Sequence, residues 1–87
     1  MPAPAIKICG VTTPASLDAA IVARADHVGF NFYPPSPRFL SAADAAQLAS
    51  RAAGRIGRVG VFVDADDATI AAAITAAGLD AVQLHGS

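Results

Sequence analysis

Short apolar runs alternate with longer alanine-rich runs along the whole chain. The apolar runs have the length of strands; they are AIKIC (5–9), HVGFNFY (27–33), RVGVFV (58–63) and DAVQLHG (80–86). The runs between them, at 14–25, 41–54 and 68–78, have the length and alanine content of helices. This alternation predicts an α/β fold in the order β-α-β-α-β-α-β, with parallel strands joined by right-handed crossovers.

Helix-capping signals support this division of the chain. Thr13 followed by Pro14 predicts an N-cap and a first helical residue. Ser41, with Asp44 three residues later, resembles a capping box at the start of the second helix. The acidic turn at 64–67 suits the positive end of the third helix, and Gly78 predicts its end.

Two architectures fit this order of elements, an open doubly wound sheet and one half of an eight-stranded (β/α)8 barrel. Polar residues within the strands help to separate them. Lys7 and Cys9 share one face of the first strand, and Gln83 and His85 share one face of the last. Polar groups gathered at the C-terminal strand ends favour a barrel mouth over a sheet covered by helices on both faces.

Composition restricts the class of protein. The chain has 87 residues, a net charge of −1 and 54% hydrophobic residues, which predicts one compact unit over 1–87 rather than two domains. Scattered and balanced charges argue against a nucleic-acid partner, and no window approaches the roughly 20 apolar residues of a membrane span. One cysteine forms no internal disulfide, and no spacing indicates a zinc site. With no signal-peptide pattern visible, we expect a cytoplasmic location.

Residues at the C-terminal ends of parallel strands are the candidates for chemistry. A lone cysteine such as Cys9 is most often a small buried residue, whereas a functional role requires its thiolate form, as a nucleophile or general base. Arg38, in a loop with three prolines, is either a solvated charge or a planar fork for a carboxylate or phosphate. For His85 a core histidine is favoured over a ligand or base, and for Asp64 a helix cap over a catalytic acid. Lys7 lies deeper than Cys9, which favours a structural partner for it over catalysis.

The motifs KICG, GFNFYPPSPR, VGVFV and VQLHG, in this order and spacing, resemble the phosphoribosylanthranilate isomerase family of tryptophan biosynthesis. The resemblance implies a (β/α)8 barrel and an Amadori rearrangement of N-(5-phosphoribosyl)anthranilate to 1-(2-carboxyphenylamino)-1-deoxyribulose 5-phosphate, without a metal or organic cofactor. It also implies that Cys9 is the general base and that Arg38 engages the anthranilate carboxylate. Asn31 and His85 would lie near the site without a chemical step of their own.

The family's general acid and phosphate-binding loops belong to later strands, beyond residue 87. We therefore expect residues 1–87 to be the N-terminal half of a barrel, inactive alone, that self-associates or requires its C-terminal half. Three alternatives remain open from the residues. One is a flavodoxin-like module with Cys9 in its core, and another is a different phosphosugar barrel enzyme. The third is an interaction half completed by a partner chain.

Overall fold

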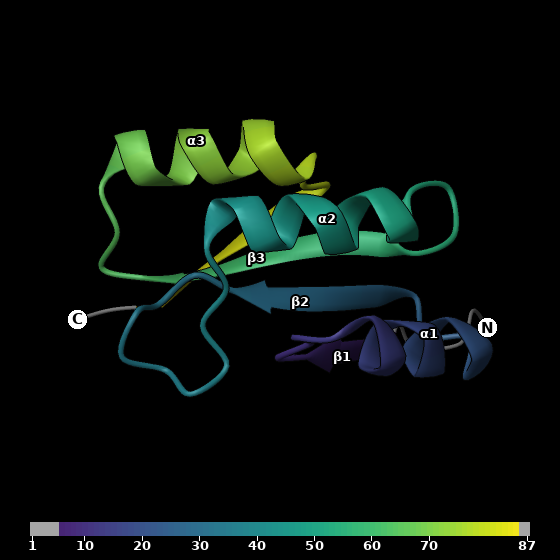
Figure 1. Cartoon of the computed structure of the whole chain (residues 1–87). Helices are drawn as coiled ribbons and strands as arrows, with labels where there is room; N and C mark the ends of the chain where they lie inside the picture. The colour runs from purple at the N-terminus through teal and green to yellow at the C-terminus, as the bar shows by residue number, and fades with distance from the viewer. Residues whose placement is uncertain (1–5, 86–87) are drawn as a thin grey trace, which may run out of the picture.

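The computed structural model describes residues 6–85 and confirms the predicted order of elements. These are β1 (Lys7–Cys9), α1 (Pro14–Val22), β2 (His27–Asn31), α2 (Ala42–Ala52), β3 (Gly57–Val63), α3 (Asp67–Ala77) and β4 (Ala81–His85). The strands run in one direction, and their C-terminal ends lie on the same side as the long loop between β2 and α2 (Figure 1).

The four strands form one parallel sheet in the order β1-β2-β3-β4. Cys9 pairs with Gly29, Asn31 with Val61, and Val61 in turn with Gln83. A doubly wound sheet reverses its strand order at a switch point, and this sheet has no such reversal among its four strands. The sequential order is that of a (β/α)8 barrel, so the flavodoxin-like alternative is wrong.

The three helices pack against one face of the sheet. Val28, Phe30 and Phe62, which point to this face, are almost fully buried. Their helical neighbours in the same hydrophobic cluster include Leu17, Ala20, Ala45, Leu48, Ala49, Ala52, Ala73 and Ala77. Strand residues alternate between faces, so the opposite set points away from the helices. This opposite face, here called the open face, carries Lys7, Cys9, Gly29, Asn31, Gln83 and His85.

The helix starts follow the predicted caps in two cases out of three. The Thr13 hydroxyl accepts from the Ser16 amide, and the Ser41 hydroxyl accepts from the Asp44 amide at 3.1 Å. The cap predicted at Asp64 is wrong, because Asp66 is the N-cap of α3 and accepts from the Thr69 amide at 2.8 Å. Hydrogen bonding by the Thr69 side chain, and then by its amide, lowers the pKa of the Asp66 carboxyl.

Helix α1 ends at Val22, three residues earlier than its alanine-rich sequence predicts. Arg24 takes a left-handed conformation (φ 61°), its amide donates to Ile21, and the Ala25 amide donates to Ala20 at 3.1 Å. These two bonds form a Schellman motif. The usual signal for this ending is glycine, and here arginine holds the position, which is why the sequence did not reveal it.

The two edge strands leave apolar side chains exposed on the helix side of the sheet. Ile8 on β1 is 42% exposed, and Val82 and Leu84 on β4 are 39% and 64% exposed. Each of the three helices connects two consecutive strands, β1 to β2, β2 to β3 and β3 to β4. Among residues 6–85 no helix therefore lies beyond β1 or β4 to cover the outer side of either edge strand. No helix in this part of the chain is long and apolar enough to cross a membrane.

Candidate active site

Cys9 ends β1 on the open face, and its side chain is exposed. The sulfur lies over Gly29 of β2, where an added Cβ would be only 2.9 Å from Sγ. The missing side chain at Gly29 therefore leaves the space that the thiol occupies. The interpretation of Cys9 as a small buried residue is wrong, and the thiol is free to meet a ligand on the open face.

The turn after Cys9 is fixed to the neighbouring strand. The amides of Gly10 and Val11 both donate to the Gly29 carbonyl, at 3.0 and 3.2 Å. Gly10 adopts φ +75°, a left-handed conformation that glycine reaches without the steric cost of a Cβ. The chain thus leaves β1 sharply, and Cys9 keeps its position at the edge of the sheet.

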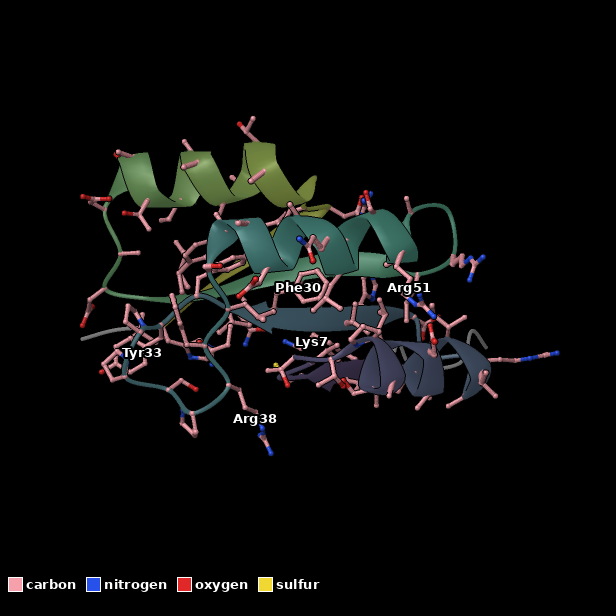
Figure 2. The ribbon with its side chains drawn as sticks, in the orientation of Figure 1. Lys7, Phe30, Tyr33, Arg38 and Arg51 are labelled. Atoms are coloured by element: carbon pink, nitrogen blue, oxygen red, sulfur yellow. The ribbon has the colours of Figure 1, made fainter. Side chains whose placement is uncertain are left out.

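The loop that carries Arg38 is held by short-range hydrogen bonds as well as by its prolines. Asn31 Oδ1 accepts from the Tyr33 amide at 2.8 Å, and the Asn31 carbonyl accepts from the Leu40 amide at 2.8 Å. Within the loop, Ser36 Oγ accepts from the Arg38 amide at 3.1 Å. Asn31 therefore acts on the structure of the loop, and Figure 2 shows Arg38 extending from the loop near the end of β1.

The Arg38 side chain passes directly over Gly10. A Cβ built on Gly10 would lie 2.4 Å from Arg38 Cδ and 3.2 Å from Nε, so any side chain at this position would displace the arginine. The structure consequently brings Arg38 next to the residue that follows Cys9. An exposed thiol and a planar guanidinium at one edge can serve a substrate that has both an acidic hydrogen and an anionic group.

A second group of polar side chains crosses the open face from one sheet edge to the other. The Lys7 ammonium donates to Gln83 Oε1, and Gln83 Nε2 lies 2.9 Å from His85 Nε2. Three strand spacings would separate β1 from β4 by about 14 Å in a flat sheet, so this contact requires a curled sheet. Lys7 has the structural partner that its depth predicted. His85 is exposed, so the prediction of a core histidine is wrong.

Asp64 contributes to the sheet edge through its backbone. It adopts φ +49°, and its amide donates to the His85 carbonyl at 3.1 Å.

Within residues 6–85 there is no group of three histidine, cysteine or acidic side chains that could hold a metal ion. A cavity of about 740 Å³ lies between the loops after β2 and β3, lined by Phe32, Tyr33, Phe39 and Ala73 among others, and Cys9 does not line it.

Sequence reasoning missed the parts played by Gly10, Gly29 and Gln83. A glycine directly after the strand-ending cysteine was visible in KICG, but its contact with Arg38 depends on how a distant loop folds back. The pairing of Gly29 with Cys9 depends on strand register, for which the sequence gives no direct signal. Gln83 was placed on the correct face without a partner.

Comparisons with known proteins agree on one family. The sequence model described as N-(5′-phosphoribosyl)anthranilate (PRA) isomerase matches residues 6–87. The N-(5′-phosphoribosyl)anthranilate isomerase of Nitrobacter hamburgensis is 51% identical over 81 residues, which are 93% of this chain and 36% of that protein. The crystal structure of phosphoribosyl anthranilate isomerase from Thermotoga maritima is 38% identical, with a TM-score of 0.93, over 98% of this chain and 42% of that one.

Another similar structure contains a bound ligand. It is a phosphoribosyl anthranilate isomerase in complex with reduced 1-(o-carboxyphenylamino)-1-deoxyribulose 5-phosphate. It is also 38% identical, with a TM-score of 0.93, and the match covers 98% of this chain and 44% of that one. This chain therefore spans well under half the length of the proteins that it resembles.

Proposed function

Because the chain belongs to the N-(5′-phosphoribosyl)anthranilate isomerase family, we propose that it supplies the first half of that enzyme's active site. The reaction is the Amadori rearrangement of N-(5-phosphoribosyl)anthranilate, a step of tryptophan biosynthesis. In this proposal residues 1–87 are one structural unit, four strands of a (β/α)8 barrel, and the complete enzyme acts in the cytoplasm on a small phosphosugar substrate.

The observation that carries this proposal is the placement of Cys9 and Arg38. The exposed thiol lies on the open face, and the Arg38 side chain crosses the adjacent Gly10. In the rearrangement, an acid first protonates the ring oxygen of the sugar and opens the ring to an iminium. The Cys9 thiolate then removes the proton from C2, giving an enolamine that becomes the ketone, while Arg38 binds the anthranilate carboxylate.

In our proposal, the general acid and the phosphate-binding loops belong to the C-terminal part of the enzyme, which corresponds to the part of the relatives that this chain does not match. The match covers 36% of the Nitrobacter hamburgensis protein, and barrel phosphate sites are usually built by the loops after strands seven and eight. The acid and the phosphate cradle accordingly lie outside this chain in our proposal. We expect no turnover from the 87-residue chain alone, and we expect it to self-associate through the exposed residues of its edge strands.

Joining this chain to the remainder of a relative tests the proposal. A fusion of residues 1–87 to the unmatched C-terminal part of the Nitrobacter hamburgensis protein should restore growth of a tryptophan auxotroph that lacks the isomerase. Cys9→Ser in the fusion should abolish growth without lowering the melting temperature by more than a few degrees. Arg38→Met should raise KM, while Arg55→Met, at another exposed arginine, should not. An active Cys9→Ser enzyme would refute the assignment.

A further inference from the structure

The polar chain on the open face has a fixed direction of hydrogen bonding. Lys7 is half-buried, and its ammonium group contacts Gln83 Oε1 across the sheet. The other end of the same amide, Nε2, lies 2.9 Å from His85 Nε2. Gln83 therefore connects a permanent donor on β1 with an imidazole on β4.

The donors and acceptors of Lys7 and Gln83 determine which ring nitrogen of His85 carries the proton. A lysine ammonium has donors and no acceptor, so it can bind only the oxygen of the Gln83 amide. With that oxygen occupied, the NH2 group faces the imidazole, and NH2 can only donate. The facing atom, His85 Nε2, must then be an acceptor, which places the proton of the neutral ring on Nδ1.

We infer that Gln83, oriented by Lys7, is a positioning residue that holds His85 as the neutral Nδ1–H tautomer. Within residues 6–85 the Nδ1 atom makes no hydrogen bond, so its N–H is available to an oxygen atom of a ligand on the open face. If Nε2 carried the proton, two donors would face each other, the Nε2–H of His85 and the NH2 group of Gln83. If the Gln83 amide were rotated by 180° to avoid this, its NH2 group would instead face the Lys7 ammonium, which is also only a donor. His85 consequently presents a donor to the substrate and leaves proton abstraction to Cys9; this role rests on the proposed function.

Nitrogen NMR reads the tautomer without any need for activity. The chain has two histidines, so a ¹⁵N-histidine sample of the 87-residue protein, compared with a His27→Asn variant, assigns both rings. At pH 8, long-range ¹H–¹⁵N correlations should show His85 protonated at Nδ1; an associated sample gives the same information by solid-state ¹⁵N NMR. A His85 ring protonated mainly at Nε2 overturns the inference.

Two substitutions test the cause of this tautomer. Gln83→Glu replaces the NH2 by an acceptor, so His85 should now donate from Nε2, and its spectrum should change to the Nε2–H or doubly protonated form. Gln47→Glu makes the same change at the chain's other, exposed glutamine and should leave His85 unchanged. Lys7→Met, which removes the orienting donor, should give a mixture of tautomers. An unchanged His85 spectrum in both Gln83→Glu and Lys7→Met overturns the inference.

Kinetics of the fusion enzyme separate this inference from the proposed function. Gln83→Glu should lower kcat/KM by about tenfold or more, with Gln47→Glu within twofold of the parent enzyme, as expected for loss of one oriented donor. An inactive fusion with the expected His85 spectrum would refute the proposed function and leave the tautomer assignment intact. An active fusion whose His85 is protonated at Nε2 would refute the tautomer assignment alone.

Discussion

The substitution Gly10→Ala, which adds one methyl group, should move the Arg38 side chain while changing the stability of the fold only slightly. A Cβ at Gly10 would lie 2.4 Å from Arg38 Cδ, whereas ordinary contact begins at 3.4 Å, so the arginine must move by about 1 Å. Because the arginine side chain is long and flexible, this movement should cost little stability. It should, however, move the guanidinium away from a ligand beside Cys9.

Gly54 offers a matched control within the same chain. It has the same φ of +75°, and an added Cβ there would have nothing within 4 Å. In both positions alanine brings a left-handed strain of about 1–2 kcal/mol, partly offset by about 0.4–1 kcal/mol from the less flexible unfolded chain. Urea unfolding of Gly10→Ala and Gly54→Ala should therefore show similar free energies of unfolding, both slightly below that of the parent chain.

Substrate binding should distinguish the two variants. Loss of a hydrogen bond to a charged group costs about 1.5–3 kcal/mol, which corresponds to about a 10- to 150-fold rise in KM. In the fusion enzyme we expect this rise for Gly10→Ala and an unchanged KM for Gly54→Ala. If both variants bound substrate equally well, the contact between Gly10 and Arg38 would have no part in placing the guanidinium, and the reasoning would fail.

Three further predictions concern stability and association. The Arg51 guanidinium lowers the pKa of Asp18 through hydrogen bonds of 2.8 and 2.6 Å, so the pair should stabilise the protein above the unfolded-state pKa of about 3.9. The difference in unfolding free energy between the parent and Asp18→Asn should therefore shrink as the pH falls below about 4, and shrink also in high salt. Phe30→Ala, at a fully buried ring, should cost about 3–5 kcal/mol in urea unfolding, a large part of the total for a chain of this size. Leu84→Thr on the edge strand should reduce association in sedimentation velocity, whereas Val22→Thr, 82% exposed on α1, should not.

The sequence predicted the fold well where local chemistry decides it. Thr13 and Ser41 cap their helices because a hydroxyl at the N-cap binds an amide nearby in the chain, and this depends on few other residues. The end of α1 was missed because Arg24 takes a conformation that usually requires glycine, and the Schellman bonds around it compensate. The N-cap of α3 was assigned to the wrong residue because its acidic turn contains three aspartates, any of which could cap a helix.

The candidate site depends on contacts between residues of different strands, which the local sequence does not predict. The position of Cys9 at a strand end was visible in the sequence, but the space that its thiol occupies is left by Gly29 on the next strand. The Lys7–Gln83–His85 contacts link residues 76 positions apart, and they exist only because the parallel sheet curls until its edge side chains meet. A curl of this kind is set by the twist of all four strands together, so no single motif encodes it. The fold class and the motifs therefore indicate which residues share a face of the sheet. The tautomer of His85, in contrast, depends on contacts that only the folded sheet creates.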